Sequence, residues 1–143
     1  MSLVSGLLAG VAKDGQIRHE FTVNELKFVL RGLSSEEQLV ADSMVNTKRL
    51  RDKYGDGLSI LNDTVGKMRT MGMVALATET INDQSPVDSD KPLKDQFKQR
   101  LELQEELMGL DVSMMDRITL EYNKLVTKQR DFFKDIDENI KKS

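Results

Sequence analysis

The apolar positions of residues 113–142 recur at steps of three and four, which predicts one long amphipathic helix. Gln129 is the only polar member of this C-terminal seam. At about 1.5 Å per residue the helix would span roughly 43 Å, whereas a small domain is about 30 Å across. We therefore expect the seam to extend beyond its own core and to bind another chain. The seam positions are Met115, Ile118, Tyr122, Leu125, Gln129, Phe132, Ile136 and Ile140.

Residues 17–31 carry the alternation of apolar and polar side chains that is typical of β-strands. The alternation is interrupted at Asn24-Glu25, where the chain can turn. Together with the turn dipeptide Asp14-Gly15, it predicts a small antiparallel hairpin or meander over residues 8–31. The alternative is that residues 24–31 form a helical turn capped by Asn24.

A first helix pair is predicted over residues 34–81. Ser34 and Glu37 have the spacing of a capping box, which begins a helix that continues to about residue 54. The second helix of the pair is predicted over residues 58–81. Its Gly66 and Gly72 each weaken a helix by up to about 1 kcal/mol relative to alanine, so we interpret them as places where another backbone approaches closely.

Residues 82–92 hold both prolines and several turn formers, which predicts a linker. A second helix pair is predicted over residues 93–142, with Gly109 ending its first helix. The whole chain, 1–143, then forms a single domain. The predicted fold is mainly α: a helical bundle with long antiparallel helices and a small N-terminal β-hairpin or meander.

The composition narrows the classes of function. With 21 basic and 24 acidic residues and a net charge of −3, the chain has no basic patch suited to nucleic acid. The absence of cysteine fits a reducing compartment and excludes disulfides and thiol catalysis. The apolar stretch 1–12 lacks a basic leader and is too short to span a bilayer, so we expect neither a signal peptide nor a membrane anchor. These observations predict a cytoplasmic protein.

Candidate catalytic residues are nearly absent from the sequence. There is no glycine-rich phosphate loop, zinc-protease motif or nucleophile elbow. His19 is the only histidine, and no partner that would orient it for catalysis can be identified from the sequence. We therefore expect a structural histidine, no enzyme activity and no cofactor.

One stretch partly matches a calcium-binding loop. Asp52, Asp56 and Asp63 occupy positions where ligands belong, and Gly57 occupies that of the turn glycine. However, Tyr54 stands at a ligand position, and Asp63 is shorter than the usual bidentate glutamate. We interpret the stretch as a helix connector and expect no metal site. A calcium-responsive helical switch is kept as a second alternative function.

Two groups of residues are the candidates for binding a partner. Phe132, Phe133 and Ile136 lie near the end of the long C-terminal helix, where an aromatic pair can anchor in a groove. The competing interpretation is that one ring packs inward and the other is partly exposed. The second group lies on the helix over residues 58–81, because methionine suits adaptable contacts, and it consists of Met68, Met71 and Met73.

Four stretches together resemble the small proteins that chaperone tail or baseplate assembly in tailed bacteriophages. The phrase LRGLSSEE leads from a short β segment into a helical body, and VALATETIN precedes an acidic loop. LMGLDVSMM and ITLEYNKL then lead into the last helix. The similarity extends over most of residues 14–133. It implies binding without catalysis.

The resemblance also implies the partner and the setting. Such proteins attend a helical tape-measure protein or the baseplate hub in the host cytoplasm while the tail is built. A permanent virion subunit of the tail, baseplate or head–tail connection is the alternative, and self-association into a homo-oligomer stays open. The resemblance assigns no individual binding residue.

Overall fold

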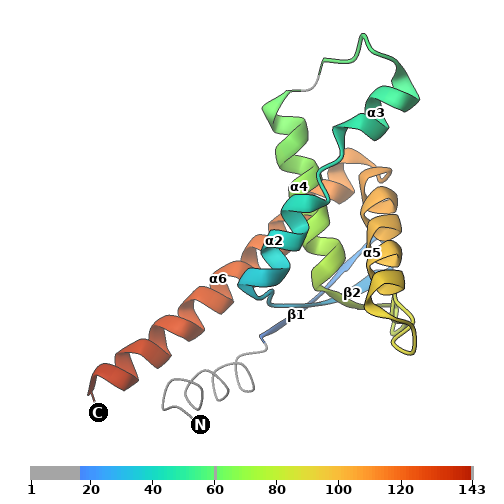
Figure 1. Cartoon of the computed structure of the whole chain (residues 1–143). Coiled ribbons are helices and arrows are strands. Elements are labelled where there is room, and N and C mark those ends of the chain that lie inside the picture. Colours follow the sequence, from blue (N-terminus) through green and yellow to red (C-terminus); the bar gives the residue numbers. More distant parts are fainter. Residues whose placement is uncertain (1–16, 60, 143) are drawn as a thin grey trace.

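The computed structural model describes residues 17–59 and 61–142. This part of the chain is mainly helical with one small antiparallel sheet (Figure 1), which confirms the coarse prediction. The predicted structure over residues 8–16, including the turn at Asp14-Gly15, lies outside the described residues. The elements are β1 (Arg18–Val23), β2 (Leu26–Arg31), α2 (Ser35–Ser43), α3 (Thr47–Tyr54), α4 (Asn62–Ala77), β3 (Thr78–Ile81), α5 (Leu93–Met108) and α6 (Val112–Lys142).

The hairpin β1–β2 forms where the alternation predicts it. Val23 pairs with Leu26 across the turn, and Phe21 pairs with Phe28. The turn residues Asn24 and Glu25 have φ values of 46° and 69°. Two consecutive positive φ values are those of a type I′ turn, whose twist matches that of the flanking strands. The alternative helical interpretation of residues 24–31 is therefore wrong.

The sheet contains a third strand that the sequence did not predict. The predicted helix over residues 58–81 begins at Asn62 and ends at Ala77, and Thr78–Ile81 forms β3 beside β2. Arg100 of α5 donates hydrogen bonds to the carbonyls of Ala75 and Thr78, which lie at this helix end. Burial, followed by the nearby charge of Arg31, lowers the pKa of Arg100. A guanidinium from another helix thus satisfies carbonyls that a continuing helix would have bonded itself.

The predicted helix over residues 34–54 is two helices. Its start is confirmed, because the Ser34 hydroxyl accepts from the amide of Glu37 at 3.2 Å and the Glu37 carboxylate accepts from the amide of Ser34 at 3.1 Å. However, α2 ends at Ser43. The side chain of Asn46 then caps α3 by accepting from the amide of Arg49. Asparagine favours such caps, so Asn46 begins a new helix after α2 has ended.

One apolar core joins the sheet to the helices. Phe21 of β1 and Phe28 of β2 stack on the inner face of the sheet, with their ring centroids 5.1 Å apart. α6 and α4 contact the sheet, and α2 and α5 pack against α4.

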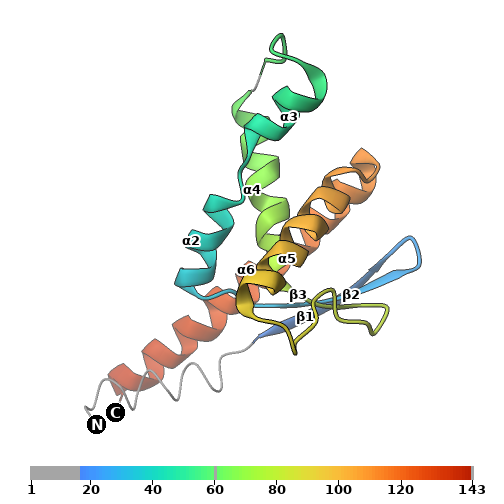
Figure 2. The same ribbon diagram turned by 45° about the vertical axis from the view of Figure 1, so that its right-hand side comes forward.

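The predicted bundle of long antiparallel helices is not confirmed, because α6 packs chiefly against β1 and not along α5. Figures 1 and 2 show α6 crossing behind α4 and then extending away from the other helices. No described helix is both long and apolar enough to cross a membrane.

A buried glutamine ties three helices together. Gln104 of α5 has no exposed surface, and its Nε2 donates to the carbonyls of Met44, after α2, and Met68, in α4, at 3.0 and 2.9 Å. A Cβ atom at Gly72 would lie 3.2 Å from this nitrogen and 3.5 Å from the carbonyl oxygen of Ala41. The interpretation of Gly72 as a place of close approach is therefore confirmed.

The same interpretation is wrong for the other glycine of α4. A Cβ atom at Gly66 would meet nothing within 4 Å. The two glycines thus form a matched pair, since they share one helix and differ in what surrounds them.

Replacing Gly72 with leucine should lower the free energy of unfolding by about 1–3 kcal/mol, because the added atoms overpack the contact with Gln104. Gly66→Leu is the control, and it should leave stability unchanged or raise it by up to about 1 kcal/mol through better helix propensity. Urea denaturation followed by circular dichroism measures both. Equal stability of the Gly72→Leu variant and the natural protein would contradict the close packing.

Candidate functional site

Helix α6 is divided into a half that packs on the body and a half that extends from it. In the first half, the four seam residues are at most 9% exposed, as predicted for a core-facing stripe. Leu125 is the last buried residue among those α6 positions whose burial is described. The four are Met115, Ile118, Tyr122 and Leu125.

The polar seam residue Gln129 has a partner in the same chain. Its Nε2 donates to the carbonyl of Leu33 at 3.1 Å. Its side chain also lies so near Gly32 that a Cβ atom there would be 2.9 Å from it. Gly32 therefore leaves room for Gln129 as well as ending the strand segment. This contact marks the boundary between the two halves of α6.

His19 of β1 anchors the first half of α6. Its Nε2 lies 2.6 Å from Oε2 of Glu121, and its Nδ1 lies 2.7 Å from Nζ of Lys128. An ammonium group can only donate, so Nδ1 is the acceptor and the proton is assigned to Nε2, which donates to Glu121. The neutral imidazole thus bridges an acidic and a basic side chain of the same helix.

Glu121 is a buried carboxylate surrounded by donors. It is 3% exposed, and it also accepts from Nε of Arg117 at 3.3 Å and from Nζ of Lys124 at 3.1 Å. The hydrogen bond from His19 is the largest cause that lowers the pKa of Glu121 to about 2, and Lys124 and Arg117 act in the same direction against the opposing effect of burial. The carboxylate is therefore charged at neutral pH.

The pair His19–Glu121 has the orientation of a catalytic dyad, but both ring nitrogens are already engaged by side chains. Neither is left to exchange a proton with a substrate, so the geometry fits an anchor for α6. The sequence did not reveal this partner, since Glu121 lies 102 residues away from His19. The one sequence signal that pointed to this partner was the place of Glu121 directly beside the seam residue Tyr122.

Two members of the predicted methionine surface are buried in this fold. Met68 and Met71 are 0% and 1% exposed. Met73 is half-buried, and its sulfur accepts a hydrogen bond from the Tyr122 hydroxyl at 3.5 Å. Met68 and Met71 fill space between α4 and its neighbours and offer no surface to a partner while the helices stay packed, whereas Met73 is only partly covered.

The aromatic candidates lie in the extending half of α6. Phe132 is half-buried, and α6 continues through Phe133 and Ile136 to Lys142. The side chains of Phe133 and Ile136 lie outside what the structure describes. In both ribbon views the end of α6 projects from the body formed by the sheet and α2–α5 (Figure 2).

The three aspartates of the calcium-like stretch do not form a site in the described part of the chain. No group of three acidic or histidine side chains able to hold a metal is found within residues 17–59 and 61–142. Asp52 and Asp56 are exposed, and Gly55, with φ of 95°, ends α3 between them. The stretch is a helix connector in this structure.

Comparison with known proteins adds no assignment: no protein-family model, curated protein or solved structure matches this chain.

Replacing Glu121 with glutamine should lower the free energy of unfolding at pH 7 by about 1–3 kcal/mol, because charge-assisted hydrogen bonds become neutral ones. The pKa of Glu121 is lowered by folding, so its stabilisation is complete above the ordinary value of 4.5 and is lost as the pH falls from there towards 2. The advantage of the natural protein over Glu121→Gln should therefore shrink across that range. Urea denaturation at a series of pH values measures it.

The control is Glu102→Gln, which changes an exposed carboxyl group of α5. Its difference from the natural protein should stay nearly constant over the same pH range. A constant difference for Glu121→Gln as well would rule out the charged anchor.

Proposed function

We propose that this protein assists the assembly of a bacteriophage tail or baseplate by binding a helical partner through the extending half of α6. One observation carries the proposal: the seam keeps its spacing beyond Leu125, the last buried residue among the α6 positions whose burial is described, along a helix that continues to Lys142. The candidate contact residues are Phe132, Phe133 and Ile136. Charged residues surround them, as is usual for an interface with a polar rim.

The spacing also favours one kind of partner. Steps of three and four residues average 3.5, which is the repeat that two helices share when they wrap around each other in a left-handed coiled coil. In the first half of α6 the same stripe is covered by the sheet and α4. In the second half a helix of another chain would cover it, and an aromatic pair would supply the anchor.

The phage setting is supported by the resemblance of four sequence stretches to tail and baseplate chaperones. A tape-measure protein offers long helices, and the baseplate hub is the other partner implied. A specific complex requires about 800 Å² of buried surface on each partner. The alternative role is a permanent virion subunit, in which the same seam would pack against a neighbouring structural protein or a second copy of this chain.

Changing Phe132 and Phe133 together to serine should abolish binding while leaving the fold intact, because Leu125 is the last buried residue among the α6 positions whose burial is described. The experiment is co-expression with a tape-measure or baseplate hub protein of the same phage, followed by size-exclusion chromatography. Circular dichroism and thermal melting report the fold.

Leu39→Ser is the matched control, since Leu39 is 70% exposed on α2 and lies outside the seam. It should bind like the natural protein. If the double variant unfolds, both rings belong to the core and the anchor is refuted. If it binds normally, the surface lies elsewhere.

Particle composition separates the two roles. A chaperone should be found in infected lysate and be absent from purified particles, whereas a structural subunit should be retained at a fixed copy number. Mass spectrometry of both fractions measures this.

A further inference from the structure

Helix α3 is a basic helix that contributes little to the core. Four of its eight residues are lysine or arginine and one is aspartate, so α3 carries a charge of +3. The net charge of the chain is −3, so the residues outside α3 together carry −6. None of the residues of α3 is buried, and in both ribbon views it lies at the end of the molecule that is remote from the sheet (Figures 1 and 2).

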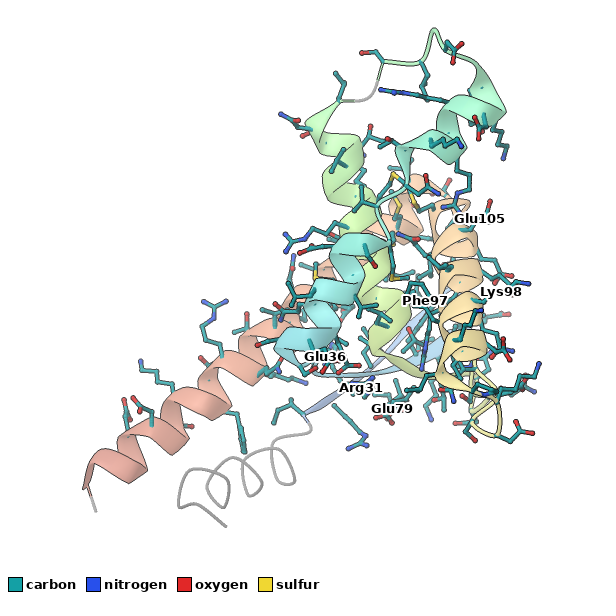
Figure 3. The ribbon with its side chains drawn as sticks, viewed as in Figure 1. Arg31, Glu36, Glu79, Phe97, Lys98 and Glu105 are labelled. Atoms are coloured by element: carbon teal, nitrogen blue, oxygen red, sulfur yellow. The ribbon has the colours of Figure 1, made fainter. Side chains whose placement is uncertain are left out.

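One ion pair holds α3 to the body, and it leaves a basic face exposed. Nη1 of Arg49 lies 3.2 Å from Oε2 of Glu105, at the end of α5 that is nearest to α3 (Figure 3). Lys48, Arg51 and Tyr54 follow one another at steps of three residues and therefore share a second face, the basic face of α3. Tyr54 is 65% exposed, and neither cation of this face forms an ion pair within residues 17–59 and 61–142. Arginine and tyrosine are enriched where interfaces bind most strongly.

A hollow of about 460 Å³ between α5 and the loop after β3 has the opposite charge. Its only charged residues, in the described part of the chain, are the exposed Glu102 and Glu106, and neither has an ion-pair partner there. The loop wall is fixed to α5, because the amide of Asp88 donates to Oε1 of Gln99 at 2.8 Å and Nε2 of Gln99 donates to Oδ2 of Asp88 at 3.0 Å. We call this site the acidic hollow. Its apolar lining residues are Ile81, Pro86 and Leu103.

The basic face and the acidic hollow match in spacing and in chemistry. Lys48 and Arg51 are three residues apart on one helix, and Glu102 and Glu106 are four residues apart on another. Both spacings place side chains on one face, roughly 5–6 Å apart. Two cations of α3 can therefore meet two carboxylates of α5 at the same time. The ring of Tyr54 would then lie against the apolar lining of the hollow.

The α3 helix of the same copy does not fill the acidic hollow. None of the lining residues belongs to α3, and the residue of α5 that α3 contacts, Glu105, is not part of the lining either. The cations and the carboxylates thus remain unpaired on two separate surfaces of one molecule. A second copy of the chain offers each surface the charge that it lacks.

We propose that the basic face of α3 docks in the acidic hollow of a second copy of this chain, with Lys48 and Arg51 against Glu102 and Glu106. The contact joins two different surfaces, so two copies can make it twice, or several copies can close a ring. A short helix entering one hollow is a small interface, and we expect weak association that depends on concentration. This surface is separate from the seam around Phe132.

The first test is sedimentation velocity of the full-length protein over a range of concentrations up to about 0.1 mM, which detects association with micromolar constants. The average mass should rise with concentration at low salt. It should fall again in about 0.5 M salt, because salt screens exposed charges. A protein that stays monomeric over the whole range would overturn the proposal.

Two charge-reversal variants examine the two surfaces separately. Lys48→Glu combined with Arg51→Glu changes the basic face, and Glu102→Lys combined with Glu106→Lys changes the acidic hollow. Each double variant should raise the dissociation constant of self-association at least about 10-fold, since two ion pairs are replaced by repulsion. Unchanged self-association of either folded variant would refute the docking.

Mixing the two double variants decides whether the surfaces meet between copies. The first variant keeps an intact acidic hollow and the second keeps an intact basic face, so together they should form a 1:1 complex that neither forms alone. Absence of this complex from a mixture of folded variants would contradict the proposal. Lys67→Glu combined with Lys94→Glu is the matched control: it changes the net charge as much as the α3 variant does, at exposed positions outside both surfaces, and it should self-associate like the natural protein.

Circular dichroism reports whether each variant folds. If the α3 variant does not, Lys48→Gln combined with Arg51→Gln replaces it and should also weaken association. The Phe132→Ser/Phe133→Ser variant should self-associate normally, so failure here and failure of the proposed function are distinguishable. Self-association that only this phenylalanine variant loses would assign the contact to the seam and overturn the docking of α3.

Discussion

Glu121 keeps a negative charge at a position that is 3% exposed, and the placement of α6 depends on how that charge is stabilised. An unpaired buried carboxylate would cost several kcal/mol, so it has to be paired and hydrogen-bonded. Arg117 and Lys124 come from the same helix and could pair with Glu121 on any surface. His19 comes from β1, and it is the donor that fixes where the helix lies.

The position of His19 is in turn set by the sheet. It pairs with Leu30 of β2, and β2 pairs with β3, which follows directly from the end of α4. The helix α4 ends there because Arg100 of α5 bonds its last carbonyls. A chain of local contacts therefore connects α5 to α6 through the three strands, although these two helices hardly pack along each other.

The sequence predicted those features that depend on neighbouring residues. Alternation interrupted at Asn24-Glu25 located the hairpin, Ser34 with Glu37 located a helix start, and the seam located the buried face of α6 up to Leu125. These signals act over a few residues, so a single sequence contains them.

The features that were missed depend on residues far apart in the chain. Thr78–Ile81 continues a helical pattern and becomes a strand because β2 is beside it and Arg100 satisfies the helix end. Met68 and Met71 could equally have been surface or core, and the packing of α2 and α5 on α4 decided it. His19 had no visible partner because Glu121 is 102 residues away. Neither periodicity nor capping carries such information.

The anchoring of α6 also bears on how its extending half would bind. Lys128 contacts His19 and Gln129 contacts Leu33, so two adjacent residues are tied to the body just before the seam extends from it. The remaining turns continue a helix that is already formed and whose direction is fixed at its base. A partner would then meet an ordered helix, and the entropy lost on binding would be smaller than for a segment that folds on contact.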